Sequence, residues 1–345
     1  MLSRAVLIVS SWSNKPTTRD AYTHFFQEQA TSTPLAPSLD LSGKTVVVTG
    51  VTSGIGLEIS HQLLGRKVSN LIMAVRNLSK GEMVRQALLS ESAIKAANPN
   101  VIIKVMQLDM ESFVSVQRFA SAFKAEFQDL HLLLANAGIG TVAKELASSG
   151  HEKNIQVNYL SNVLLTLALL PTLETTAEKT GKPTRVTWTC SRMLEYSREV
   201  LKHFDAVDGL PTLTRYADSR LLCVLFQLEL AKHYNPDKVI INSFCPGHVN
   251  TSMGDDLPIY LRILASAVKA IRARPVHKAG WIALNAGLVA GPETHGKLLE
   301  DMVVEEPWEF IKSKEGERVR KMLWNKTIDE MVRVEVPPVW MTKLE

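Results

Sequence analysis

The sequence lacks several features that define large classes of protein. It has three cysteines (Cys190, Cys223 and Cys245), an odd and small number, and all three lie in apolar segments. It has no block of like charges, and its net charge of +4 is too small to indicate a nucleic-acid partner. No stretch reaches the ~18 apolar residues of a membrane span. We therefore expect buried free thiols in a reducing, cytoplasmic setting, with no nucleic acid, transmembrane span or metal site.

What the sequence does have is a long alternation of apolar strands and amphipathic helices. The chain of 345 residues is ample for one large domain. The alternation from residue 41 to about 250 predicts an α/β fold, a doubly wound, mostly parallel sheet with helices on both faces. Residues 1–40 are predicted to be an N-terminal extension or linker. Residues 251–345 are expected to complete the same single domain.

A glycine-rich turn follows the first predicted strand, Thr45–Val48. The segment 49–56 reads Thr-Gly-Val-Thr-Ser-Gly-Ile-Gly, and apolar residues recur at helical spacing after it. Strand, glycine turn and helix form the geometry of a Rossmann-type dinucleotide site, where the helix N-terminus offers free N–H groups to a pyrophosphate. An ordinary strand-to-helix turn is the alternative, since such turns are often rich in glycine.

The end of the second predicted strand, Asn70–Val75, indicates which dinucleotide is bound. An acidic residue there would bind the adenosine ribose hydroxyls of NAD and repel a 2′-phosphate. This chain has Val75 followed by Arg76. Arginine can hold a phosphate with two charge-assisted hydrogen bonds, so the sequence predicts NADP(H). A solvated arginine after a strand is the alternative.

Later strands end in further polar or small residues. Asp109 follows the third strand, on the ligand side of an open sheet, although a cap for the helix starting near Ser112 is the alternative role. The segment 136–138, Asn-Ala-Gly, follows the fourth strand, and small residues there let the backbone pass close to a cofactor. Asn158 lies in a long apolar helix, where a buried amide needs partners, so a purely structural role stays open.

Five markers in order resemble the short-chain dehydrogenase/reductase family over roughly residues 43–300. They are Thr-Gly-x-x-x-Gly-Ile-Gly, Asn-Ala-Gly, the helix Asn158, Ser191 with Tyr216-x-x-Ser, and Pro-Gly-x-Val-x-Thr at 246–251. The gap of 25 residues from Ser191 to Tyr216 and the segment after the second strand are similar to the retinol-dehydrogenase-like branch, which includes many reductases of fungal secondary metabolism. The resemblance implies catalytic residues Ser191, Tyr216, Arg220 and Asn158. It implies that NADP(H) contacts Gly50, Ser53, Gly54, Ile55, Gly56, Arg76, Asp109, Asn136, Ala137, Gly138, Tyr216, Arg220, Val249 and Thr251.

One position departs from the family's Tyr-x-x-x-Lys signature, because Arg220 stands where the family has lysine. Reduction of a ketone needs a proton on oxygen, and a free tyrosine, with a pKa near ~10, gives one up more readily beside a cation. Arginine keeps the charge and the hydrogen-bond donors but does not release its proton. We expect Arg220 to keep the lysine's electrostatic role, whereas its proton-relay role is in doubt.

The resemblance implies that the segment after Thr251 covers the substrate. Its apolar helix face predicts a lipophilic small-molecule substrate, and the basic residues Arg262, Lys269, Arg272 and Arg274 also permit a peripheral contact with a membrane surface. Beyond it, residues 295–299 resemble the branch's last strand and residues 308–331 its C-terminal helix. From the apolar pattern we also predict a helix over residues 81–97 and a sixth strand over Val239–Cys245. Self-association is left open. The favoured function is an NADP(H)-dependent interconversion of carbonyl and alcohol in secondary metabolism. The alternatives are a nucleotide-binding scaffold or regulator of weak activity and an isomerase or dehydratase on the same fold.

Overall fold

A computed structural model describes residues 32–141, 145–192, 212–251, 273–334 and 341. The chain divides into two compact units, residues 1–33 and 34–345, and the fold below is that of the second. Most of the predicted N-terminal extension and the predicted cover of the substrate, residues 252–272, lie outside the described residues.

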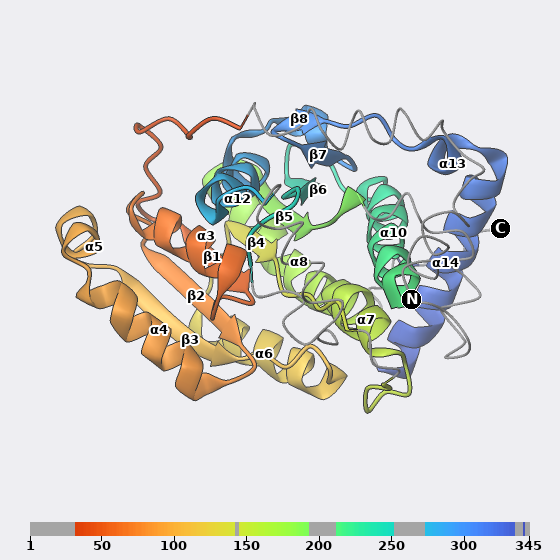
Figure 1. Cartoon of the computed structure of the whole chain (residues 1–345), viewed down its shortest axis with the longest axis horizontal. Helices are drawn as coiled ribbons and strands as arrows, with labels where there is room; N and C mark the ends of the chain where they lie inside the picture. The colour runs from red at the N-terminus through yellow and green to blue at the C-terminus, as the bar shows by residue number, and fades with distance from the viewer. Residues whose placement is uncertain (1–31, 142–144, 193–211, 252–272, 335–340, 342–345) are drawn as a thin grey trace, which may run out of the picture. The chain divides into compact units, whose positions relative to one another are not determined.

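The second unit is built on an eight-stranded sheet in the order β3-β2-β1-β4-β5-β6-β7-β8 (Figure 1). Every neighbouring pair is parallel except β7 and β8. The predicted Rossmann-type class is therefore confirmed. The strands are β1 (Thr45–Thr49), β2 (Asn70–Val75), β3 (Ile102–Gln107), β4 (Leu132–Ala135), β5 (Thr184–Thr189), β6 (Val239–Cys245), β7 (Leu298–Glu300) and β8 (Val303–Val304).

The strand order reverses at β1, which pairs with β2 on one side and with β4 on the other. In an open parallel sheet, ligands bind outside the carboxyl ends of the strands at such a reversal. The glycine turn after β1 and the Asn-Ala-Gly segment after β4 both leave the sheet there. All five residues of β1 are buried, which explains its unbroken apolar run.

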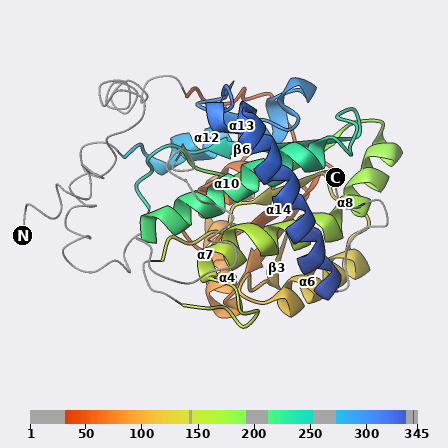
Figure 2. The same ribbon diagram turned by 90° about the vertical axis from the view of Figure 1, so that its right-hand side faces the viewer.

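Helices cover both faces of the sheet (Figures 1 and 2). Packed with the first face are α3 (Gly54–Leu64), α4 (Leu78–Ser90), α5 (Ser92–Ala97), α12 (Val276–Leu284) and the π-helix η3 (Asn285–Val289). Packed with the second are α6 (Phe113–Glu126), α7 (Lys153–Ile155), the π-helix η1 (Gln156–Leu160), α8 (Ser161–Thr180), α10 (Thr212–Ala231) and α14 (Lys314–Arg333). The short helices η4 (Pro292–Thr294) and α13 (Glu309–Lys312) complete the described elements.

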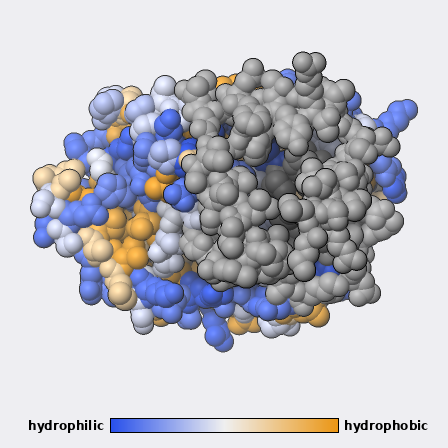
Figure 3. Space-filling model, viewed as in Figure 1, coloured by the Kyte–Doolittle hydropathy of each residue, from blue (hydrophilic) through white to orange (hydrophobic). Residues whose placement is uncertain are grey.

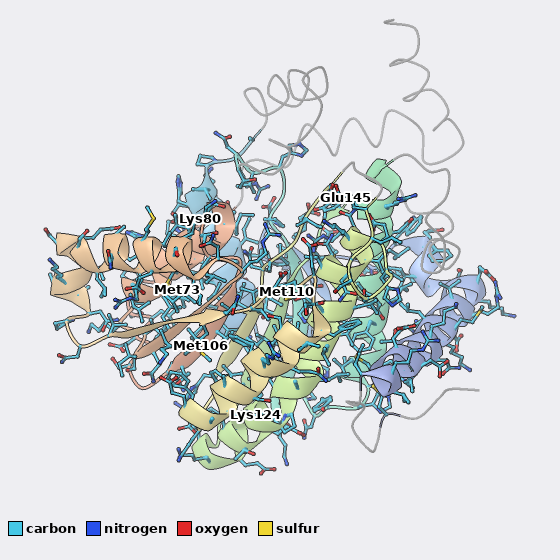
Figure 4. The ribbon with its side chains drawn as sticks, turned by 90° about the horizontal axis from the view of Figure 1, so that it is seen from below. Met73, Lys80, Met106, Met110, Lys124 and Glu145 are labelled. Atoms are coloured by element: carbon cyan, nitrogen blue, oxygen red, sulfur yellow. The ribbon has the colours of Figure 1, made fainter. Side chains whose placement is uncertain are left out.

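Two apolar cores lie on opposite faces of the sheet. Met73 on β2 belongs to one and Met106 on β3 to the other, and both are labelled in the view from below (Figure 4). The C-terminal helix α14 packs on α10 in the second core, where the rings of Phe226 and Trp324 stack with centroids 5.4 Å apart. This packing explains why the last described helix belongs to the same domain as the sheet.

The structure corrects three details of the predicted elements. The single helix expected over residues 81–97 is two helices, because Glu91 has an extended backbone between them. The helix expected over 308–331 is interrupted at Ser313, whose hydroxyl accepts a hydrogen bond from Gly316 N at 3.0 Å and caps α14. The antiparallel strand β8 has only two residues, too short for its sequence pattern to indicate a strand.

One described helical run, Lys153–Thr180, has the length and apolar composition of a membrane-crossing helix. Polar residues such as Asn158, Asn162 and Thr166 interrupt this run, so it is not a stretch of ~18 apolar residues of the kind that the sequence was predicted to lack. Its most apolar window is 72% buried inside the protein, as expected of a core helix that packs against the sheet. Elsewhere the surface carries isolated apolar side chains, such as Leu78 and Met83 on α4, and Figure 3 shows apolar residues gathered on the left of one face. Exposed side chains of this kind are common and by themselves predict no partner.

Candidate active site

The glycine turn between β1 and α3 is packed by the protein's own backbone. Gly50 has a φ of +71°, and a Cβ there would lie 2.9 Å from Ala137 Cα. A Cβ at Gly56 would lie 2.3 Å from Gly50 O and 2.6 Å from Asn136 Nδ2. These two glycines are thus required for the turn to close on the Asn-Ala-Gly segment, a reason that the sequence pattern alone did not give.

The first turn of α3 is suited to an anion. Ser53 is the N-cap residue, yet its side chain makes no capping hydrogen bond. The N–H groups at a helix start carry a partial positive charge and bind phosphates when no side chain caps them. Ile55 lies in this turn, and a Cβ at Gly54 would lie 3.3 Å from Thr251 Cγ2. The residues present therefore fit a dinucleotide pyrophosphate, which the backbone of 53–56 would hold.

The Asn-Ala-Gly segment after β4 is tied to β1 and β5. Ala137 N donates to Thr49 Oγ1 at 2.8 Å, and Asn136 Nδ2 donates to Thr49 O at 3.1 Å. Thr189 Oγ1, at the end of β5, donates to Asn136 Oδ1 at 3.3 Å. The carboxyl ends of three neighbouring strands are thereby fixed relative to one another at the reversal of strand order.

Asn158 lies in the π-helix η1 and has its side chain fully bonded. Its Oδ1 accepts from Ile139 N at 2.8 Å, and its Nδ2 donates to Ile139 O and to Ser219 Oγ, both at 2.9 Å. The amide therefore holds the loop after Gly138 against helix α10. This is the satisfied structural amide that the sequence left open, and the π-helix is a type of irregularity that often occurs at functional sites.

Arg220 is a buried cation where three of the predicted motifs meet. Only 2% of its surface is exposed, and its Nη1 donates to Thr189 O at 2.9 Å. A Cβ at Gly138 would lie 2.4 Å from its Nη2, so only glycine fits beside the guanidinium. Its Nε, also buried, makes no hydrogen bond with the described residues. The larger arginine is thus accommodated in the place where the family has lysine.

The charge of Arg220 is secure. Burial lowers the pKa of its guanidinium, but electrostatic interactions with Tyr216, Cys223 and Cys190, and a hydrogen bond to Tyr216, raise the pKa above its ordinary value overall. Burial itself raises the pKa of both thiols to about 12, so they stay neutral. Arg220 therefore supplies a permanent positive charge and does not pass its proton on.

Tyr216 lies one helical turn before Arg220 on α10, and the Arg220 Cζ is 5.1 Å from the centroid of its ring. A Cβ at Gly140 would lie 3.6 Å from the same ring, so Tyr216 faces the loop after Gly138. Ser191 follows β5, and Cys190 N just before it donates to Phe244 O on β6 at 2.8 Å. The structure thus brings Tyr216, Arg220 and Asn158 together beside the strand end that leads to Ser191.

Arg76 lies at the end of β2, as predicted, but in an ion pair that the sequence did not reveal. Its side chain is 69% exposed, and its Nη1 is 3.0 Å from Glu111 Oε1. Lys153 Nζ lies 3.2 Å from the other oxygen of the same carboxylate. Glu111 belongs to the loop after β3, and a spacing of 35 residues carries no periodic signal that would have paired it with Arg76.

Asp109 shapes this same loop. Its Oδ1 accepts from Glu111 N at 2.9 Å, and its own N–H donates to Ser115 Oγ at the same distance. The cap of α6 is Ser112, which accepts from Ser115 N at 3.3 Å. Asp109 is therefore not the helix cap that was the alternative reading, and its predicted contact with the cofactor stays a prediction.

The loop after β6 carries Val249 and Thr251 toward the glycine turn. Val249 forms a parallel bridge with Arg274, and Asn250 N donates to Arg274 O at 3.2 Å. Arg274 is 5% exposed and forms an ion pair with Asp301. The expectation that Arg274 faces a membrane surface is therefore wrong, because its charge is used inside the protein. The three other basic residues of that expectation lie outside the described residues.

The prediction of buried free thiols is confirmed. Cys190, Cys223 and Cys245 are all free and buried. Cys223 Sγ contacts Ser219 O at 3.1 Å and Asn158 O at 3.2 Å, which places this thiol under the candidate site. Within the described ranges, no group of three or more His, Cys, Asp or Glu residues is arranged to hold a metal ion.

Comparison with known proteins supports the same assignment. The family described as short chain dehydrogenase matches residues 44–259. The chain is 46% identical over 309 residues to the short chain dehydrogenase macD of Penicillium terrestre. The aligned region covers 86% of this chain and 94% of that protein.

Solved structures share the fold at lower identity. The Pseudomonas aeruginosa RhlG/NADP active-site complex has a TM-score of 0.59 and 23% identity, covering 77% of this chain and 97% of that one. The NADH-dependent reductase A1-R′ responsible for alginate metabolism has a TM-score of 0.57 and 18% identity, with the same coverage of both chains. The family match, the close relative and the site together show that this chain belongs to the short-chain dehydrogenase/reductase family of oxidoreductases.

Proposed function

We propose that the protein uses NADP(H) to interconvert a ketone or aldehyde and an alcohol on a lipophilic small molecule, in secondary-metabolite biosynthesis in the cytoplasm. The observation that carries the proposal is the buried cation of Arg220 beside the Tyr216 ring. A permanent charge in a water-poor site stabilises a phenolate far more than the same charge in water does. Such an arrangement serves proton transfer to and from a substrate oxygen.

The residues of the site divide the work between them. When bound, the nicotinamide cofactor supplies or takes up the hydride. Tyr216 Oη gives a proton to the carbonyl oxygen in reduction and takes it back in oxidation. Ser191 hydrogen-bonds the same oxygen and orients it. Arg220 stabilises the Tyr216 phenolate, while Asn158 fixes the loop against which both side chains pack.

The route by which Tyr216 regains its proton differs from that of a lysine site. A buried arginine whose pKa lies above its ordinary value has no proton to lend. The proton that reloads Tyr216 Oη therefore passes through a hydroxyl group or water. This difference leaves the carbonyl chemistry possible, since it changes only the path of a proton that ends in solvent.

The preference for NADP(H) is supported by the end of β2. Val75 and Arg76 stand where an acidic residue would select NAD(H), and the exposed guanidinium is accessible to a phosphate. The solved structures are too distant to decide, because they include both an NADP complex and an NADH-dependent reductase. A lipophilic substrate is the partner we propose, and self-association or a peripheral membrane contact has no support from the described residues.

One experiment separates this proposal from its alternatives. The purified protein is mixed with NADPH or NADH and a panel of decalones, polyketide-like ketones and retinoids, and cofactor oxidation is followed by absorbance. Turnover of at least one carbonyl compound with NADPH supports the proposal. Tight binding of NADPH with no turnover of any compound favours a scaffold. Conversion of a compound without cofactor oxidation favours an isomerase or dehydratase.

A further inference from the structure

Two adjacent carboxylates lie at the tip of the last hairpin of the sheet. Glu300 ends β7, and Asp301 and Met302 form the two-residue turn into β8. Both turn residues have positive φ, +44° at Asp301 and +69° at Met302. Two such residues in succession are required by the hairpin turn whose usual sequence is Asn-Gly or Asp-Gly. Methionine is unfavourable in this conformation, so the turn is kept at a cost in stability.

Glu300 forms an ion pair with the segment that carries Ser191. It is 4% exposed, and its Oε2 lies 2.9 Å from Nε of Arg192, the residue directly after Ser191. Glu300 also lies beside Cys245 in the register of β6 and β7. A charged contact from the β6–β7 edge thus holds the residue next to Ser191.

Asp301 is bonded to the loop that leads to Thr251. Both of its carboxylate oxygens contact the Arg274 guanidinium, with Nη2 to Oδ2 at 3.3 Å. Two-pronged pairs of this kind fix orientation as well as distance. Arg274 in turn donates its N–H to His248 O at 2.7 Å, and its guanidinium lies over Gly247, where a Cβ would come 2.7 Å from Cζ. Asp301 therefore holds the loop through Arg274.

We propose that the β7–β8 turn positions two separate parts of the active site. Glu300 acts through Arg192 on Ser191, and Asp301 acts through Arg274 on the loop 247–251, which ends against Gly54 of the glycine turn. The two acids are successive residues, so the distance between the parts they hold is set by one short hairpin. The positive φ at Asp301 directs its carboxylate toward Arg274. This role accounts for a turn whose backbone conformation is unfavourable.

Each link also has the chemistry of a positioning contact. The two acids and the two arginines balance in charge, and three of the four residues, Glu300, Arg274 and the Asp301 side chain, are at most 11% exposed. Buried pairs hold geometry because loss of one partner leaves the other charge without a counterion. Glu300 and Asp301 are not expected to touch substrate, and their effect on turnover passes through Ser191 and Thr251.

Hydrogen exchange of backbone amides tests the proposal without any substrate. In Glu300→Gln, the Arg192 amide should exchange about tenfold faster or more, while the amides of Asn250 and Arg274 keep their rates. In Asp301→Asn the pattern should reverse. Asparagine tolerates positive φ, so this change removes only the charge. Glu306→Gln, which removes the exposed pair with Lys312 just beyond the hairpin, is the matched control and should change neither site.

Kinetic constants add a second readout, which rests on the proposed function. Glu300→Gln should lower kcat by about tenfold with an unchanged Kd for NADPH, since it loosens Ser191. Asp301→Asn should weaken NADPH binding, since it loosens the loop at Thr251. Arg274→Lys keeps the charge but not the two-pronged contact, and it should reproduce the Asp301→Asn exchange pattern if that variant does not fold.

The outcomes test the positioning role of the hairpin separately from the proposed function. Exchange rates that rise at both sites in both variants, or at neither, would overturn the positioning role, because the hairpin would then act on stability alone or not at all. The separate, site-specific patterns support it. If those patterns are seen while the parent protein oxidises no NADPH with any carbonyl compound, the positioning role stands and the proposed function fails.

Discussion

The guanidinium carbon of Arg220 lies 5.1 Å from the centroid of the Tyr216 ring, and its Nη1 is hydrogen-bonded at 2.9 Å to the carbonyl of Thr189. One side chain thus joins the helix of the candidate acid to the strand that leads to Ser191. The family has lysine at this position, and the structure shows how arginine is accommodated: Gly138 leaves room for the second nitrogen.

Replacement of Arg220 tests whether its charge or its size matters. Arg220→Met removes the cation and should reduce kcat/KM by roughly 100-fold, the usual worth of a group that supports acid–base catalysis. Arg220→Lys keeps the charge and restores the family pattern, and it should retain most of the activity or exceed the parent. Steady-state kinetics with a substrate of the parent enzyme gives the comparison. A methionine variant as fast as the parent would show that the cation is dispensable.

Gly138→Ala tests the space beside Arg220. Its Cβ would lie 2.4 Å from Arg220 Nη2 and 3.0 Å from Asn158 Oδ1, so the guanidinium must move. We expect activity to fall at least tenfold, about 1.4 kcal/mol in transition-state stabilisation, while the protein still folds. Gly140→Ala is the control, since its Cβ would meet the Tyr216 ring at an ordinary 3.6 Å. Equal activity of the two variants would contradict the packing described for Arg220.

Two changes at the end of β2 test the choice of cofactor. Arg76→Ala should weaken NADPH binding by on the order of 2 kcal/mol, the worth of a charged hydrogen-bond pair, and leave NADH binding nearly unchanged. Glu111→Gln removes the carboxylate that now pairs with Arg76 and should strengthen NADPH binding several-fold. Arg85→Ala, which breaks a surface pair on α4, is the control. Titration of cofactor fluorescence measures each Kd, and tighter binding of NADH than NADPH by the parent would refute the assignment.

Acid stability should depend on His131. Burial, followed by the charge of Lys44, lowers the pKa of its imidazole from 6.5 to about 4, and its Nδ1 accepts from Thr45 N at 3.1 Å. Between about pH 6.5 and 4, the His131 imidazole binds a proton in the unfolded chain but not in the folded chain. Stability should therefore fall between about pH 6.5 and 4, by at most about 1.4 kcal/mol per pH unit and less because the ring is partly exposed.

Denaturant unfolding across this pH range measures the effect. His131→Asn keeps an acceptor for Thr45 N but does not titrate, so its stability should change less between pH 6.5 and 4 than that of the parent. If the parent and the variant lose stability equally, other groups carry the acid sensitivity.

Much of the fold could be read from the sequence because local patterns determine it. The strands Asn70–Val75 and Val239–Cys245 occur with the predicted bounds, since each is rich in apolar residues and crosses a buried sheet. Positions where a helix breaks were missed. Glu91 and Ser313 interrupt segments whose apolar spacing continues on both sides, and the interruption depends on capping and backbone geometry rather than on periodicity.

The candidate site was predicted where its residues form motifs, and missed where it depends on distant pairing. The meeting of Gly138, Asn158 and Arg220 follows from motifs on three elements that share one edge of the sheet. The pairs of Arg76 with Glu111 and of Arg274 with Asp301 join residues whose spacing fits no helix or strand period. They become visible only when the loops are folded, and the second of them reversed our interpretation of Arg274.

The most direct test of the proposed chemistry is the kcat/KM of Tyr216→Phe, measured beside its Kd for NADPH. The substitution removes one hydroxyl and keeps the ring next to Gly140 and Arg220. Our account predicts a fall in kcat/KM of roughly 100-fold or more with an NADPH Kd within about twofold of the parent, because only the acid–base group is lost. A phenylalanine variant as active as the parent would contradict it, since the proton would then come from another group.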